Sequence, residues 1–166
     1  MNVKQSTIDA LYNLITGAFE MNRAFDRMVS VLGVNFACNH SSGLIHKGIA
    51  HYFPNFSDLI GERCLERYNI NVEYGETPEG KQDYARVTDI IQNMEDKGIE
   101  YQNMVIGACK VALDNGDLQI YSDLSDLLRD YNKIVEQLIL LNDKIQKYGE
   151  GRIMSFDHDI DTFWNL

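Results

Sequence analysis

The stretch Tyr68-Asn69-Ile70-Asn71-Val72-Glu73-Tyr74 decides the fold, because it reads as an extended chain between long helical patterns. Its apolar residues alternate with polar ones, which is the period of an extended strand and not of a helix. About ten such residues, at roughly 3.3 Å each, cover about 33 Å. Two antiparallel helices need only a few linking residues. We therefore expect residues 68–77 to run along a bundle and to join two parallel helices.

Two long helical patterns precede this crossover. Apolar residues recur every three or four positions from about Ser6 to Phe36, with Asn22 as the polar exception that we expect at the edge of the stripe or paired across the bundle. A loop is expected at residues 37–43. A second helix then follows to about residue 67, and its stripe continues across Pro54. The unbroken stripe favours a kinked rod, whereas the alternative is a break with a new helix beginning at Pro54.

Two more helical patterns follow the crossover. Thr77-Pro78-Glu79 predicts a helix start, because it offers a capping threonine, a first-turn proline and an early acid. A tight turn at residues 114–117 leads into the fourth helix. We expect a buried seam on that helix, formed by Leu127, Tyr131, Ile134 and Leu138. Residues 1–148 are thus predicted to form one all-α four-helix bundle, and residues 149–166 a tail whose aromatic side chains dock on the bundle or on a neighbouring subunit.

Composition restricts the function classes. The chain has 166 residues, 45% of them hydrophobic and 24% charged, which suits one domain with a sizeable core. The formal net charge of -10 argues against partners such as nucleic acid or an anionic membrane. The three cysteines are far apart and form no CxxC pair, which indicates reduced thiols and a cytoplasmic protein. No apolar run is long enough to predict a membrane span.

Metal sites in helical bundles often use Glu-x-x-His pairs that point inward. The residues three positions before the four histidines are Ala37, Gly43, Gly48 and Ser155. None of them is a carboxylate, so the sequence does not predict a central di-iron carboxylate site. His46 falls near the apolar side of its helix, where we expect a hydrogen-bonded core histidine.

A different arrangement lies on the second helix. At about 100° per residue, His51, Asp58 and Glu62 fall within roughly 40° of one another, about 120° from the centre of the apolar stripe. Asp58 and Glu62 are four residues apart and are able to share one cation. His51 lies about 10 Å further along the axis, so a histidine ligand has to come from another chain. We expect that ligand to be His51 or His40. The alternative interpretation is a solvated helix face.

Two segments carry a resemblance to a known family. Asp58-Leu-Ile-Gly-Glu62-Arg63 resembles the Asp-x-x-x-Glu-Arg segment of the Dps-like mini-ferritins, a branch of the ferritin-like superfamily. Ala112-Leu-Asp-Asn-Gly-Asp117 resembles the turn that joins the third and fourth helices of ferritins and mini-ferritins. The resemblance implies a ferritin-like four-helix bundle with a long crossover. It also implies iron bound by the acid pair at a dimer interface, with histidines from the first helix of the partner.

The chain departs from that family in two respects. Its first helix contains no histidine, and no lysine-rich arm is present. We therefore carry two hypotheses. The first is a homo-oligomer that binds iron or a similar divalent metal between subunits, with ferroxidase or iron-storage activity. The second is a metal-free bundle that serves as an assembly or binding module.

Overall fold

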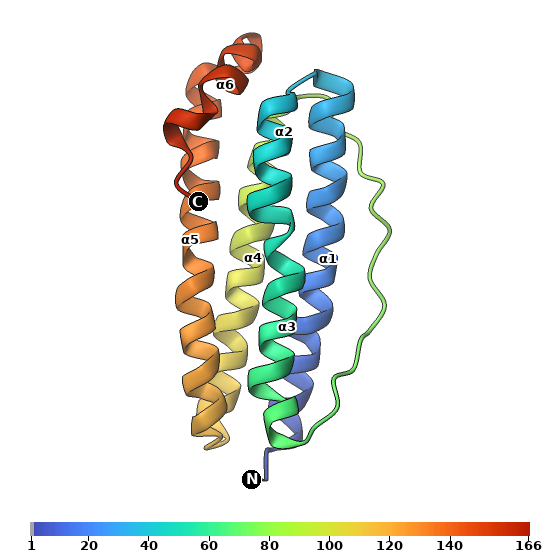
Figure 1. Cartoon of the computed structure of the whole chain (residues 1–166), viewed down its shortest axis with the longest axis vertical. Helices are drawn as coiled ribbons and strands as arrows, with labels where there is room; N and C mark the ends of the chain where they lie inside the picture. The colour runs from blue at the N-terminus through green and yellow to red at the C-terminus, as the bar shows by residue number, and fades with distance from the viewer. Residues whose placement is uncertain (1) are drawn as a thin grey trace.

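The computed structural model describes residues 2–166 and shows four long, parallel and antiparallel rods (Figure 1). The rods are α1 (Gln5–Phe36), a composite rod made of α2 (Asn39–Ile45), the π-helical turn η1 (His46–Ala50) and α3 (Tyr52–Cys64), α4 (Val87–Asp114), and α5 (Leu118–Tyr148). The composite rod and α4 run in the same direction, and α1 and α5 run in the opposite one (Figure 1). The predicted all-α bundle with two parallel middle rods is confirmed.

The extended crossover occupies residues 69–86 and runs along the outside of α1 (Figure 1). Side chains of α1 hold it by its backbone: the Tyr12 hydroxyl donates to the carbonyl of Asn71 at 2.8 Å, and Nε of Arg27 donates to the carbonyl of Gln82 at 2.9 Å. The crossover is therefore longer than predicted, and the predicted helix start at residues 77–79 is wrong.

A distant carboxylate explains where α4 begins. Glu150, beyond the end of α5, accepts hydrogen bonds from the backbone N–H groups of Val87 at 2.8 Å and Thr88 at 2.9 Å. A helix N-terminus has unpaired N–H groups that favour a negative partner. Glu150 supplies that partner at residue 87, so the local capping signal ten residues earlier is not used.

The connection between the first two rods, in contrast, is shorter than predicted. Only Ala37, in the left-handed conformation at φ 56°, and Cys38 separate α1 from α2. The expected loop at residues 39–43 is wrong, because these residues form the first turns of α2. Asp157 of the tail accepts the backbone N–H of Ser41 at 2.7 Å and thereby caps this short helix.

The composite rod stays helical through Pro54, as the kinked-rod interpretation predicts, and its distortion is the π-helical turn η1. Proline has no N–H to donate to the carbonyl four residues before it, which is that of Ala50. The side-chain amide of Asn22 donates to this carbonyl at 2.9 Å. The one polar residue of the first helical stripe thus has its expected partner across the bundle.

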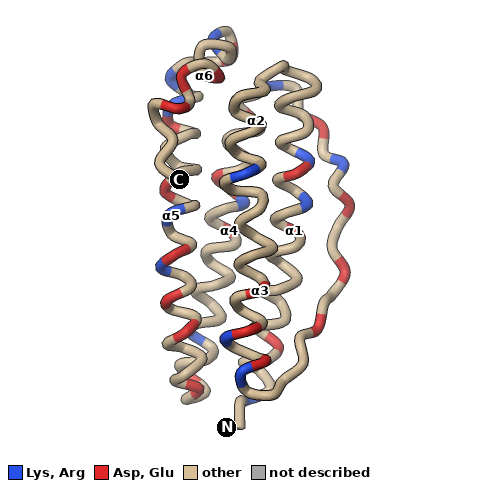
Figure 2. The backbone as a smooth tube through the Cα atoms, viewed as in Figure 1, with Lys and Arg blue, Asp and Glu red and all other residues tan. Residues whose placement is uncertain are grey.

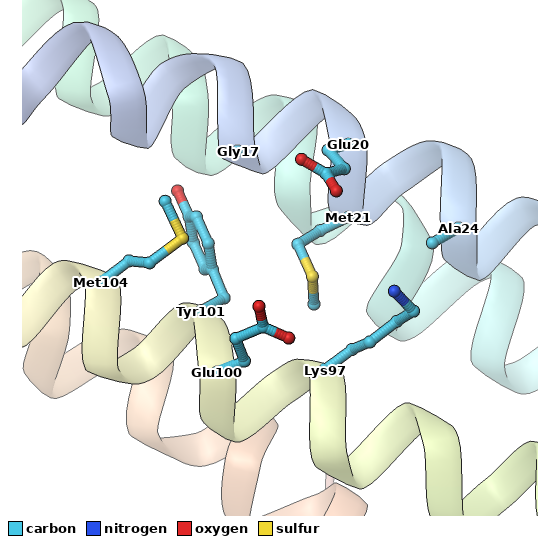
Figure 3. A pocket seen from close by; sticks show the side chains of 8 residues that line it. All are labelled: Gly17, Glu20, Met21, Ala24, Lys97, Glu100, Tyr101 and Met104. Atoms are coloured by element: carbon cyan, nitrogen blue, oxygen red, sulfur yellow. The ribbon is translucent and has the colours of Figure 1, made fainter. Parts of the chain in front are cut away.

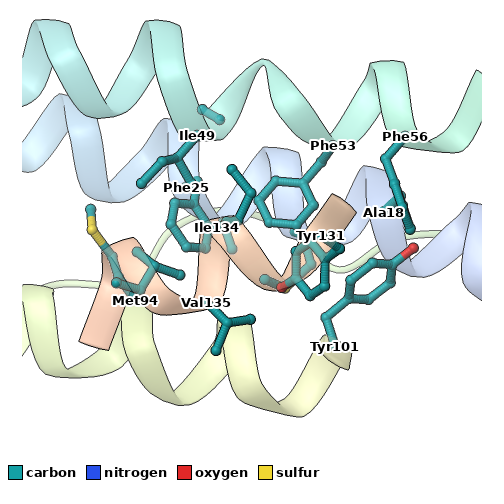
Figure 4. Close-up of a cluster of buried hydrophobic side chains, with 14 of the residues drawn as sticks. Ala18, Phe25, Ile49, Phe53, Phe56, Met94, Tyr101, Tyr131, Ile134 and Val135 are labelled. Carbon is teal, nitrogen blue, oxygen red and sulfur yellow. The ribbon is translucent and has the colours of Figure 1, made fainter. Parts of the chain in front are cut away.

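The core lies along the common axis of the four rods (Figure 4). The predicted seam of α5 is confirmed: Leu127, Tyr131, Ile134 and Leu138 are all at most 2% exposed. Helix α4 approaches this seam closely at Gly98, where a Cβ atom would lie 2.5 Å from Cδ1 of Leu138.

The C-terminal tail folds back onto its own bundle as η3 (Glu150–Arg152), α6 (Ile153–Asp159) and η4 (Ile160–Phe163) (Figure 1). Phe156 and Ile160 are fully buried, and the Gln137 amide of α5 donates to the carbonyl of Phe163 at 2.9 Å. Docking on the bundle is therefore confirmed for the tail. The short helix α6 has no counterpart in the sequence-based prediction.

Charged residues of both signs are spread along the rods and along the crossover (Figure 2). None of the helices within residues 2–166 is both long and apolar enough to cross a membrane.

Candidate metal site

The centre of the bundle is filled by aromatic rings (Figure 4). Phe53, Phe56, Tyr101 and Tyr131 have neighbouring ring centroids 5.5 to 6.1 Å apart. The Tyr131 hydroxyl donates to the carbonyl of Gly98 at 2.7 Å, so this buried polar group is satisfied within the protein. Helical bundles that bind two metals place carboxylates and histidines in this region. Here the space holds packed rings.

The central phenols are poor metal ligands. Burial raises the pKa of both Tyr101 and Tyr131, which keeps the hydroxyls neutral. The Tyr101 hydroxyl is committed to the carbonyl of Leu14 at 2.7 Å. The exposed carboxylates and histidines of the rods are the better candidate ligands.

The acid pair of α3 is on an outer surface. Asp58 and Glu62 are exposed, one helical turn apart, near the end of α3. Among residues 2–166, neither carboxylate has a side-chain hydrogen bond or an ion pair. Both are thus available to a cation, and one chain alone supplies only part of a coordination shell.

His51 is exposed on the same rod, but its partner is another histidine. The Nε2 atoms of His46 and His51 lie 2.8 Å apart, and the two rings meet edge to face with centroids 4.4 Å apart. The expectation that His46 is a core histidine is wrong, because its side chain is exposed.

The π-helical turn explains this pairing. In a regular α-helix, five residues correspond to a rotation of about 500°, which would separate the two rings by roughly 140°. In η1 the N–H of His51 instead bonds the carbonyl of His46 at 3.1 Å, and the wider turn stacks residue 51 over residue 46. The only sequence signal for this turn is Pro54, which frees a carbonyl just ahead of it.

The remaining histidines are held by the tail. Nε2 of His40 lies 2.6 Å from Oδ2 of Asp161, and Nδ1 of His158 lies 3.0 Å from Oδ1 of Asp159. The hydrogen bond to Asp159 raises the pKa of His158. Within one chain, the structure brings neither His40 nor His51 to the acid pair.

A small pocket of about 70 Å³ opens between α1 and α4, lined by Glu20, Glu100 and Lys97 (Figure 3). Its lysine supplies a cation next to the two acids. In residues 2–166, no group of three or more histidine, cysteine, aspartate or glutamate side chains is arranged to hold an ion. This pocket is therefore a weaker candidate than the outer face of α3.

Comparison with known proteins supports the fold. No protein-family model matches the chain, and no curated protein matches it. Among solved structures, it is similar to a novel open pore ferritin from the hyperthermophilic archaeon Archaeoglobus fulgidus, with a TM-score of 0.88 and 10% sequence identity. The match covers 100% of both chains. At this identity the likeness shows a ferritin-like fold and leaves the chemistry to the residues of this chain.

Proposed function

We propose that this protein forms a homo-oligomer that binds Fe²⁺, or a similar divalent metal, between subunits. Asp58 and Glu62 of one chain are the proposed carboxylate ligands, and His51 of a neighbouring chain is the proposed imidazole ligand. Ferroxidase and iron-storage activity, which the Dps-like resemblance implies, belong to the same proposal. The observation that carries it is the exposed stripe of His51, Asp58 and Glu62 on one rod whose two acids have no partner in their own chain.

A two-fold axis would complete such a site. If two α3 helices packed antiparallel about an axis near the exposed Asn55, His51 of each chain would face Asp58 and Glu62 of the other. Two equivalent sites would form at once. Two carboxylates with one imidazole are ligands that suit iron or manganese.

His40 is the other histidine proposed for this site. It would first have to leave Asp161, with which it forms a contact of 2.6 Å. His46 is closer to the proposed site, since it already touches His51.

Self-association has support outside α3. Ile106 and Leu113 lie two helical turns apart on α4 and are 47% and 46% exposed, and Leu118 at the start of α5 is 61% exposed. Since residues seven apart share one face of a helix, Ile106 and Leu113 support an interaction surface on that face of α4. The aromatic tail gives less support than expected, because its own bundle covers most of it.

An anaerobic titration of Fe²⁺ into protein without a His-tag tests the proposal. The Asp58→Ala/Glu62→Ala variant is expected to lose the binding of wild type. Glu73→Ala/Glu76→Ala is the matched control, because it removes two exposed acids of the crossover and the same charge. Equal binding by the wild type and the α3 variant would refute the site. A sedimentation mass of 19.0 kDa would refute assembly of the chain.

Two findings favour the second hypothesis, a metal-free assembly module. The bundle centre is packed with rings, and the first helix carries no histidine. An oligomer that binds no Fe²⁺ above background in this titration would establish that role in place of the first.

A further inference from the structure

We propose that His46 and His51 form a metal-chelating pair within a single chain, selective for Cu²⁺ and Ni²⁺. This site goes beyond the interface site for iron, because it requires neither the acids of α3 nor a second subunit. Both rings are exposed, their Nε2 atoms lie 2.8 Å apart, and their centroids lie 4.4 Å apart.

The spacing of the two nitrogen atoms selects the kind of ion. Two imidazole nitrogens bound at roughly 2.05 Å are about 2.9 Å apart when the N–metal–N angle is 90°, and about 3.3 Å apart when the angle is tetrahedral. The observed 2.8 Å is close to the spacing of neighbouring corners of a square-planar or octahedral shell. Cu²⁺ and Ni²⁺ favour such shells with nitrogen and oxygen ligands, whereas structural zinc sites are tetrahedral. Water molecules would complete the coordination.

The fold holds the pair in this spacing. The backbone bond from the N–H of His51 to the carbonyl of His46 closes the π-helical turn. Gly48, inside the same turn, is in contact with Trp164 of the tail; a Cβ atom there would lie 2.6 Å from Cζ2 of that ring. The contact with Trp164 thus holds the π-helical turn in place before an ion binds. Little conformational entropy of the chain is therefore lost on binding.

The chemistry requires one tautomer change and no redox step. In the metal-free protein one ring donates its Nε2–H to the lone pair of the other. For binding, that proton moves through solvent to Nδ1 of the same ring. Both Nε2 lone pairs then face the ion, and two neutral imidazoles bind it without net release of a proton.

Isothermal titration of Ni²⁺ into protein without a His-tag tests the pair. We expect one ion per chain in wild type and an affinity at least about tenfold weaker in His46→Gln and in His51→Gln, which corresponds to about 1.4 kcal/mol. His158→Gln is the matched control and is expected to bind as the wild type does. With Cu²⁺, electron paramagnetic resonance is expected to show coupling to two imidazole nitrogens, reduced to one in either variant of the pair.

Two results would overturn the proposal. Equal Ni²⁺ affinity in wild type and His46→Gln would place the ion elsewhere. Loss of Ni²⁺ binding in Asp58→Ala/Glu62→Ala would assign the ion to the interface site. Circular dichroism of each variant shows whether it is folded. Since the acid variant is expected to keep Ni²⁺ and lose Fe²⁺, this inference and the proposed function fail separately.

Discussion

Replacing Gly98 by alanine should reveal how closely α4 and α5 approach. A new Cβ would lie 2.5 Å from Cδ1 of Leu138, a side chain that is 1% exposed and would have to shift. Glycine to alanine inside a helix normally stabilises by about 1 kcal/mol. Overpacking a core costs about 1–3 kcal/mol. We expect the second effect to win, with a net loss of up to about 2 kcal/mol, which lowers the melting temperature by about 2–4 °C per kcal/mol.

The same helix provides a matched control. Gly107 is exposed, and a Cβ atom there would meet nothing within 4 Å. Gly107→Ala adds the same methyl group to α4 and is expected to stabilise by about 0.5–1 kcal/mol. The difference between the two variants in free energy of unfolding therefore measures the cost of overpacking at position 98.

Urea unfolding followed by far-ultraviolet circular dichroism, at one protein concentration, measures both variants. Leu138→Ala alone should cost about 2–5 kcal/mol. Gly98→Ala/Leu138→Ala should cost less than the sum of the single variants, because the methyl group added at position 98 enters the space that the leucine leaves. If Gly98→Ala stabilises as much as Gly107→Ala, or if the two losses add, the close approach of the helices is wrong.

Three further predictions concern caps and buried groups. Glu150→Gln should cost about 1 kcal/mol and speed amide hydrogen exchange in the first turn of α4, because it removes the negative charge that faces the helix N-terminus. Asn22→Leu should cost about 1–3 kcal/mol in urea unfolding, since it leaves the carbonyl of Ala50 without its donor. Burial raises the pKa of Cys38 to about 11 and of Cys64 to about 12, so native protein at pH 8 should react slowly with iodoacetamide and unfolded protein quickly. Because folding raises these thiol pKa values, the protonated thiols contribute to the free energy of unfolding. This contribution is present below the unfolded thiol pKa of about 8.5 and is lost as pH rises towards 11. Urea unfolding at pH 8 and at pH 10 measures the loss.

The sequence predicts the parts of this fold that depend on periodicity. Every residue of the α5 seam is buried as its spacing requires, since a helical stripe has only one way to face a core. Three alternating residues are enough to predict the crossover, although its end at residue 86 lies beyond the predicted one. Asn22 is expected to need a partner, and it has one in the carbonyl of Ala50.

The two misplaced helix starts share one cause. The predicted starts of α2 and α4 are both misplaced. At each observed start, a carboxylate from beyond the end of α5 accepts a backbone N–H: Asp157 that of Ser41, and Glu150 that of Val87. These partners are more than 60 residues away along the chain, so no local pattern contains them. The local capping signal at residues 77–79 is as good as the one at the observed start of α4, and tertiary contacts decide which of the two starts is used.

The candidate site shows the same limit at a smaller scale. Sequence reasoning finds the face that His51, Asp58 and Glu62 share, because α3 is a regular helix from residue 52 onward. It misses His46, because a regular helix continued backwards past His51 puts residue 46 on another face. A proline cannot donate at position 54, and the π-helical turn lies shortly before it.

That turn connects the fold to the proposed chemistry. Packed aromatic rings occupy the bundle centre, and the proposed ligands are exposed on a rod whose register changes once, at η1. The register change brings the imidazoles of His46 and His51 together. The regular helix beyond it keeps Asp58 and Glu62 about 10 Å or more from His51. The His46–His51 pair and the two acids of α3 are thereby separated within one chain and would meet only across a subunit contact. Binding of Ni²⁺ should consequently require only a single chain, whereas binding of Fe²⁺ should require the assembled protein.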